Sequence, residues 1–129
     1  MLKRKVSPLS LLRGIERRLV KGWCQGPAAK DKWGQGVEVE SPRACKWCLI
    51  GAMWAQAGGY HKSYSTNHIA VDRTRSLLET AIEQKWSYRD PSIFGSIVSF
   101  NEARGRTKRQ VLAVVRAAQR LALGRRRTG

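Results

Sequence analysis

A chain of 129 residues has room for one compact domain with a modest core. Its formal net charge is +16, and the excess sits at the two ends. Residues 1–32 and 104–129 carry nine Lys or Arg each, against two acids in the first range and none in the second, while the middle is neutral. A neutral body with two basic ends is typical of a protein that binds a polyanion, most often nucleic acid. The alternative is a charge excess that only keeps the protein soluble.

The same sequence argues against a membrane protein and against a secreted one. No segment approaches the eighteen or so apolar residues of a membrane span, and the apolar stretch after the basic start is broken at once by charges. The three cysteines are an odd number without a secretory signal, which favours reduced thiols and a cytoplasmic location.

The first predicted element is a helix that opens at Ser7-Pro8 and runs to about residue 21. Its apolar stripe (Leu12, Ile15, Leu19) is wide enough to dock on the protein's own core, while a second face repeats Arg13, Arg17 and Lys21 every four residues. A basic amphipathic helix of this kind can also lie on a membrane surface. Residues 22–36 are predicted to form a loop in which Trp23 and Trp33 act as apolar plugs.

The next stretch contains the predicted centre of the core. Residues 37–40 alternate like a short strand, which is not stable without a partner. Ser41-Pro42 then reads as an N-cap and first helical position, and Gly58-Gly59 as a helix end. The segment between them is apolar nearly all round, so we predict a buried central helix over about 41–57.

Three further helices follow in the predicted order. A polar loop (58–66) leads to a long helix capped by Thr66 or Asn67 and ending near residue 85, and a short helix is favoured over 92–100. Thr107 and Gln110 form a capping box that starts a last helix, which Gly124 is expected to end near residue 123. We therefore predict an all-α fold of four or five helices with at most one short strand or hairpin, as a single domain (1–124) followed by a basic disordered tail (125–129).

Two constellations suggest chemistry, and both have a simpler explanation. Cys45-x-x-Cys48 is half of a zinc or redox signature that Cys24, His61 or His68 would have to complete, but both cysteines fall within the predicted core helix, where thiols pack as small apolar groups. Cys48 with one of the histidines and Asn101 would suit a cysteine hydrolase. However, Cys48 would lie nearly two turns into the helix, where the helix dipole no longer favours a thiolate.

The third constellation is basic. Arginines and lysines gather at the start of the last helix, where free amides already favour anions, and continue along one helical face. They form either a track for phosphates or a solvated basic face. The residues predicted to bind nucleic acid are Arg104, Arg106, Lys108, Arg109, Arg116, Arg120, Arg125, Arg126 and Arg127, together with Arg13, Arg17 and Lys21 of the first helix.

Two motifs also carry a resemblance to a known family. The W-C-x-x-G-A motif beginning at Trp47 and the N-[DE]-x-x-G-R-T motif beginning at Asn101 resemble an uncharacterised family of small bacterial and phage proteins, over roughly residues 20–120. The resemblance implies a shared helical fold and no established activity. It also implies that the family shares a structural or binding site, for which the candidates are Trp47, Cys48, Asn101, Gly105, Arg106 and Thr107. The arginine-rich ends depart from the family's usual character.

The resulting hypothesis is a small, non-enzymatic protein of phage or mobile-element type, without a cofactor or metal, that binds DNA, RNA or a nucleoprotein complex through its basic terminal helices. One alternative is a protein-interaction or inhibitor module, such as an anti-defence factor, whose basic ends meet an acidic partner. The other is a cysteine hydrolase that uses Cys48.

Overall fold

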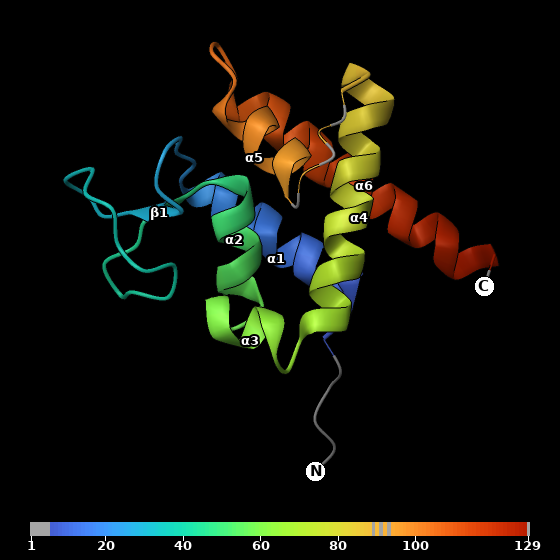
Figure 1. Ribbon diagram of the computed structural model, residues 1–129, viewed down its shortest axis with the longest axis horizontal. Helices are drawn as coiled ribbons and strands as arrows, with labels where there is room; N and C mark the ends of the chain where they lie inside the picture. The colour runs from blue at the N-terminus through green and yellow to red at the C-terminus, as the bar shows by residue number, and fades with distance from the viewer. Residues whose placement is uncertain (1–5, 89, 91, 93, 129) are drawn as a thin grey trace.

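The computed structural model describes residues 6–88, 90, 92 and 94–128, with side chains up to residue 124. This part of the chain holds six α-helices and one antiparallel pair of two-residue strands (Figure 1), so the predicted all-α class with at most one hairpin is confirmed. None of the described helices combines the length and the apolar character needed to cross a bilayer.

Helix α1 (Pro8–Lys21) has the predicted bounds. The Ser7 hydroxyl accepts a hydrogen bond from the Ser10 amide at 3.1 Å, and the Ser10 hydroxyl accepts one from the Ser7 amide, so the amides of Ser7 and Ser10 are satisfied at this helix start. The predicted apolar stripe is fully buried, which shows that α1 covers the protein's own core.

The next 27 residues form a lobe around strands β1 (Ala29–Lys30) and β2 (Lys46–Trp47), which pair with Ala29 opposite Trp47. The predicted strand at 37–40 is wrong, because only the Val37 amide pairs, with the Ala29 carbonyl at 3.0 Å, and residues 39 and 40 form a turn. The period-two pattern comes from Val39, which is buried while its neighbours are exposed. Its carbonyl accepts a hydrogen bond from the Trp47 indole nitrogen at 3.1 Å.

Helix α2 (Leu49–Gln56) is buried as predicted but starts eight residues later than expected. Its N-cap is Cys48, whose sulfur accepts a hydrogen bond from the Gly51 amide at 3.3 Å. The Ser41 hydroxyl accepts a bond from the Arg43 amide within a short turn, so the helix start that Ser41-Pro42 suggested is a local turn. A Cβ on Gly51 would lie 1.9 Å from the Ala28 carbonyl oxygen, which explains a glycine at this position.

The predicted loop at 58–66 contains a short helix, α3 (Tyr60–Tyr64), which is absent from the sequence-based prediction. Helix α4 (His68–Trp86) follows with nearly the predicted bounds. Asn67 stands at the N-cap position of α4, but its side-chain amide donates to the Ala57 carbonyl at 2.8 Å instead of capping the helix. Its side chain therefore ties the start of α4 to the end of α2.

Helix α5 (Gly95–Glu102) and helix α6 (Lys108–Thr128) complete the fold. The prediction that Gly124 ends the last helix is wrong, because the helical backbone continues to Thr128 and projects beyond the other elements (Figure 1). The division into a domain (1–124) and a basic tail (125–129) stays a prediction, because side chains from residue 125 on lie outside the described part.

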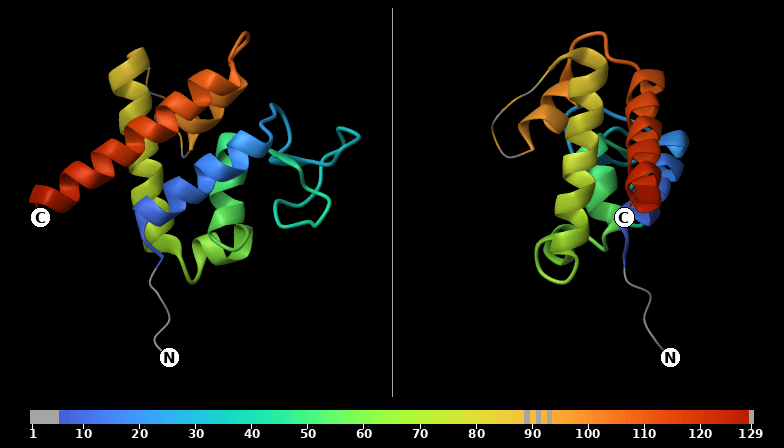
Figure 2. Two further views of the ribbon diagram at one scale, coloured as in Figure 1. Left: turned by 180° about the vertical axis from the view of Figure 1, so that it is seen from behind. Right: turned by 90° about the vertical axis from the view of Figure 1, so that its right-hand side faces the viewer.

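Helices α1 and α6 lie side by side, and α4 crosses them from the other side of the molecule (Figure 2). Helix α2 packs against α1 and α5, while α4 packs against α1, α5 and α6. The core between them is filled by side chains with almost no exposed surface, among them Leu12, Ile15, Met53, Leu78, Phe100 and Val115. One continuous core thus holds α1 and α6 in a fixed relation.

Candidate nucleic-acid interface

Helices α1 and α6 run antiparallel, and polar contacts mark their relative position turn by turn. The Lys108 ammonium group donates to the Val20 carbonyl at 2.5 Å, at the end of α1 and the start of α6. One turn earlier on α1, Glu16 pairs with Arg116 at 2.8 Å. A further turn earlier, the Leu12 carbonyl accepts a hydrogen bond from the Gln119 side-chain amide at 3.4 Å. The two basic ends of the chain, which the sequence predicted separately, therefore form one surface.

On this surface the exposed cations flank the seam between the helices. Residues 12, 16 and 20 of α1 face α6, so the exposed positions 13 and 17 come next around the helix on the solvent side. Residues 108, 116 and 119 of α6 face α1, and positions 109 and 120 are exposed beside them. We call this surface the basic face; its members are Arg13, Arg17, Lys21, Arg109, Arg116 and Arg120.

Glu16 is the one carboxylate in the sequence of α1 and α6, against eleven Lys and Arg in the same two segments. Hydrogen bonds from Gln119 and from Arg116 lower its pKa, so the carboxylate stays charged at neutral pH. Its two oxygens are occupied by these partners at 2.9 and 2.8 Å. Glu16 consequently aligns the helices and cancels one charge, and leaves the rest of the basic face positive.

The cluster predicted at the start of α6 is only partly assembled. Arg106 turns back onto α5, where its guanidinium lies 3.8 Å from the Phe100 ring centroid and its Nε donates to the Phe100 carbonyl at 2.8 Å. Burial there lowers its pKa. Lys108 is engaged with Val20, so Arg104 and Arg109 are the two exposed cations of this group. The side chains of Arg125, Arg126 and Arg127 lie outside the described part.

The Thr107–Gln110 capping box is present. The Gln110 amide donates to the Thr107 hydroxyl at 3.2 Å, and the Thr107 amide donates to the Gln110 side chain at 3.0 Å. Gly105 precedes it with φ +79°, in the left-handed region that glycine adopts without strain. This part of the second motif therefore builds the turn into α6.

The remaining shared residues form a buried joint between α2 and α5. The Asn101 side chain accepts hydrogen bonds from the Trp23 indole at 2.7 Å and the Leu49 amide at 3.0 Å. It donates to the Cys24 carbonyl at 3.2 Å and to Glu102 at 2.6 Å. The side-chain oxygen and both amide hydrogens of Asn101 are thus bonded within the protein. We conclude that Asn101 has a structural role and connects the two motifs.

The geometry does not assemble the hydrolase constellation. Cys48 is the N-cap of α2, so the expectation that it lies deep in a helix was wrong, but burial raises the pKa of its thiol to about 11 and keeps it protonated. His61 on α3 and His68 on α4 follow the opposite end of α2 (Figure 1). Cys48 therefore packs beside Asn101 without a histidine base from either position.

The three cysteines are free thiols, and Cys24 donates to the Pro27 carbonyl at 3.6 Å. Among the described side chains, no group of three His, Cys, Asp or Glu is arranged to hold a metal ion. The half zinc signature at Cys45 and Cys48 spans strand β2, with Cys48 buried beneath the lobe.

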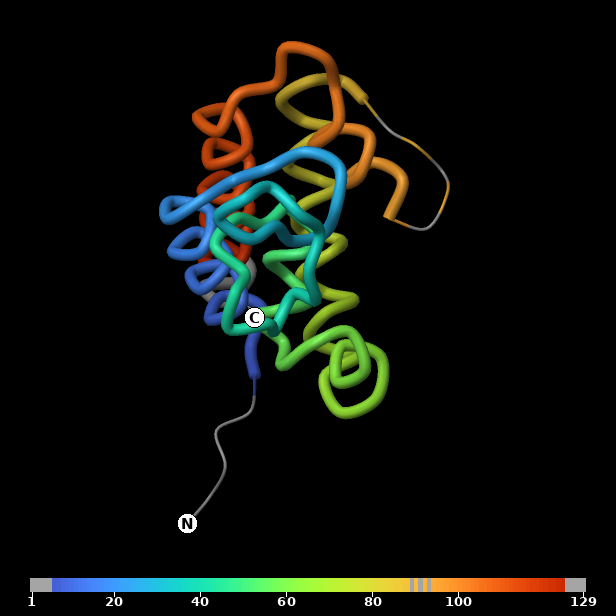
Figure 3. Tube along the Cα trace, turned by 90° about the vertical axis from the view of Figure 1, so that its left-hand side faces the viewer, coloured from blue at the N-terminus to red at the C-terminus, as the bar shows by residue number. Residues whose placement is uncertain are grey.

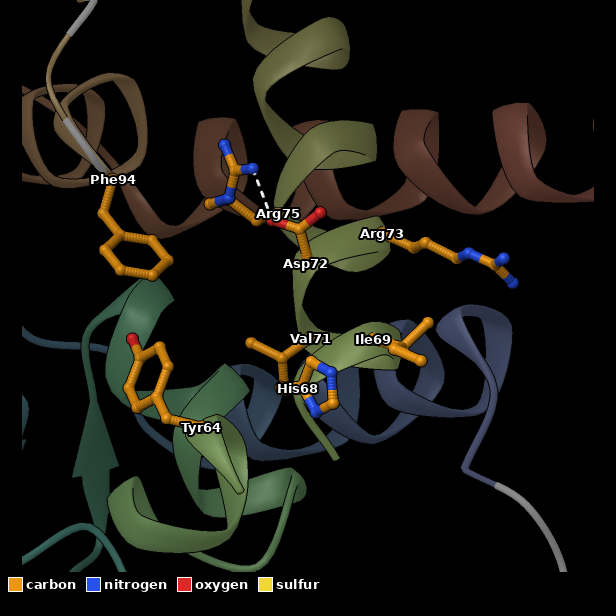
Figure 4. A pocket seen from close by; sticks show the side chains of 8 residues that line it. All are labelled: Tyr64, His68, Ile69, Val71, Asp72, Arg73, Arg75 and Phe94. Atoms are coloured by element: carbon orange, nitrogen blue, oxygen red, sulfur yellow. Dashed lines mark hydrogen bonds and ion pairs between the residues drawn. The ribbon is translucent and has the colours of Figure 1, made fainter. Parts of the chain in front are cut away.

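A second surface, which the sequence reading did not identify, is aromatic. Trp54 packs edge-on against Tyr60, Tyr64 and Phe94, with ring centroids 5.1 to 6.5 Å apart, and Tyr60 is 60% exposed. Tyr64 and Phe94 line a hollow of about 320 Å³ next to α4 (Figure 4). Arg75 in this hollow is held by Asp72 and Glu79, and Arg73 extends away from the rings. In the sequence, only the spacing of Tyr60 and Tyr64, four residues apart in a polar stretch, pointed to this aromatic surface.

Comparison with known proteins adds the family and no activity. A family model described as a family of unknown function (DUF6197) matches residues 3–121. The searches of curated proteins and of solved structures found no match to the chain.

Proposed function

The chain belongs to this family of unknown function, DUF6197, and on the evidence of its own surface we propose that it binds nucleic acid, without catalysis, through the basic face. The observation that carries the proposal is the antiparallel packing of α1 and α6. It brings exposed arginines from sequence positions about 100 residues apart to one surface with a single, already paired carboxylate.

The expected mode of binding is electrostatic. Exposed guanidinium groups on two helices offer several donors to phosphate oxygens, and their binding releases counterions condensed on the nucleic acid. Phosphate contacts position a protein without reading bases, so binding should depend only weakly on sequence.

The test is an electrophoretic shift series across salt concentrations with the wild type and two double variants. Arg109→Ala/Arg120→Ala removes two exposed cations for which the described structure shows no ion pair. Arg116 is left in place, since its removal would also free Glu16. The matched control, Lys62→Ala/Arg73→Ala, removes the same charge from exposed positions on α3 and α4.

For duplex DNA each neutralised phosphate contributes about −0.9 to the log–log salt slope. We expect a wild-type slope of roughly −4 to −6, a slope less steep by up to about two units in the basic-face variant, and no change in the control. Both variants should keep the wild-type melting temperature. The proposal would be refuted if the protein bound neither duplex nor single strand at low salt. It would also be refuted if the affinity changed neither with salt concentration nor on replacement of these arginines.

A protein-interaction or inhibitor module is the second candidate, and the exposed aromatic surface around Tyr60 favours it. Aromatic side chains are enriched at protein interfaces, and this group lies on α2, on α3 and at the start of α5, away from the basic face. A phage or mobile-element origin, an anti-defence role and a cytoplasmic location remain predictions from the sequence. A protein that fails the salt series would leave this candidate in first place.

A further inference from the structure

Trp33 was predicted to plug the domain, but it points into solvent. It is 70% exposed, the highest value among the large apolar side chains of the described residues, whereas Trp23, Trp47, Trp54 and Trp86 lie in the core or against it. Most of the apolar surface of this indole therefore stays in water, which is unfavourable.

The loop that carries Trp33 is built to hold this position. Asp31 is buried, and its Oδ1 accepts hydrogen bonds from the Trp33 and Gln35 amides, both at 2.9 Å. The Asp31 amide donates to the Gln35 carbonyl at 2.9 Å, and Lys30 pairs with Gly36 below the turn. Trp33 therefore stands at the tip of a closed turn whose conformation is fixed before any partner arrives.

Cations surround the exposed indole. The Lys32 ammonium group lies 4.5 Å from the centre of the Trp33 ring, and Arg43 lines the same hollow of about 520 Å³. Asp31 is the one carboxylate in the lining of this hollow, and its Oδ1 is occupied by backbone amides. The surroundings thus suit a ligand that is both flat and negatively charged.

The lobe that carries this turn starts directly after Lys21, the last member of the basic face on α1 (Figure 3). A nucleic-acid strand that follows the basic face toward the end of α1 therefore arrives at the lobe. Neither the exposed indole nor the cations beside it select a particular base, since every nucleotide carries a flat base and a phosphate.

From these observations we propose that Trp33 is a stacking platform for an unpaired base, with Lys32 and Arg43 holding the neighbouring phosphates, so that the preferred ligand is single-stranded nucleic acid. The inference rests on the proposed function and adds the strand type to it. In a duplex the base faces are covered by their neighbours, and a tip indole has nothing to stack on. Stacking on an aromatic side chain stabilises bound single strands by about 1–3 kcal/mol per base.

The experiment compares a fluorescent dT12 strand with a 12-base-pair duplex at matched salt, using the wild type, Trp33→Ala, Trp33→Phe and the basic-face variant Arg109→Ala/Arg120→Ala. Trp33→Ala should weaken binding to the single strand roughly 5- to 150-fold with an unchanged salt slope, and change duplex affinity less than twofold. Trp33→Phe should retain most of the affinity, because a phenyl ring still stacks. Since the indole is exposed, both variants should melt like the wild type.

The outcomes separate this inference from the proposed function. Unchanged affinity of Trp33→Ala for the single strand would overturn the platform and assign the indole to a protein partner, while a reduced salt slope in the basic-face variant would still support the proposed function. Equal weakening for single strand and duplex would also overturn the platform, because stacking requires an unpaired base. Failure of the wild type to bind either probe would end both proposals.

Discussion

Replacing Asn101 by alanine tests whether the residue shared by the two motifs is structural. The change removes four hydrogen bonds, and those to the Leu49 amide and the Cys24 carbonyl are buried. A buried polar group left without a partner costs about 1–3 kcal/mol. The bonds to Trp23 and Glu102 are only partly buried, so water can replace them.

Two buried groups left without a partner give an expected loss of roughly 2–6 kcal/mol in the free energy of unfolding. At about 2.1 cal/mol/K per residue, one kcal/mol shifts the melting temperature of a domain of this size by about 4 °C. Asn101→Ala should therefore melt roughly 7–22 °C lower than the wild type, measured by circular dichroism and confirmed by urea unfolding.

Asn67→Ala is the matched control. The Asn67 side chain donates one partly buried hydrogen bond, to the Ala57 carbonyl, so its loss should cost about 1 kcal/mol. At a temperature where it is folded, Asn101→Ala should bind nucleic acid like the wild type. A melting temperature no lower than that of Asn67→Ala, or a selective loss of binding in a stable protein, would refute the structural reading of Asn101.

Two further predictions concern packing and pH. Gly51→Ala should lower the free energy of unfolding by about 1–3 kcal/mol or more in urea titrations, because its Cβ would meet the Ala28 backbone, and an unchanged midpoint would show that β1 can shift freely. The lowered pKa of Glu16 means that its contribution to stability is present above its ordinary pKa of 4.5 and is lost as pH falls through the lower folded value. Glu16→Gln should therefore be less stable than the wild type at neutral pH and approach it in acid; a difference that stays constant with pH would contradict this assignment.

The helices whose ends are set by local side chains could be predicted from the sequence. Ser7-Pro8 and the Thr107–Gln110 box satisfy their own helix amides, so the information lies within four residues. The start of α2 could not be predicted in this way. The Trp47 amide bonds to the Gly22 carbonyl and the Cys48 amide to the Ala28 carbonyl, and these distant partners hold the chain extended where its local pattern favours a helix.

The candidate interface divides in the same way. The sequence shows which residues are basic. It does not show that α1 and α6 pack together, because this packing depends on long-range contacts such as that of Glu16 with Arg116. The exposure of Trp33 could not be predicted from residue type, because a tryptophan in a loop is usually expected to be buried. The buried Asp31 carboxylate, two residues before it, accepts hydrogen bonds from the amides of the turn that presents the indole to solvent.

The pairing of α1 with α6 also has a consequence for how the chain folds. The ion pair between Glu16 and Arg116 closes a loop of 100 residues, so the apolar side of the first helix gains its last cover only when the final helix is available. Contacts of such long sequence separation slow folding and leave intermediates with exposed apolar surface. During synthesis the emerging chain would carry Leu12, Ile15 and Leu19 partly uncovered until α6 has left the ribosome, so the core cannot close before the last helix has been made.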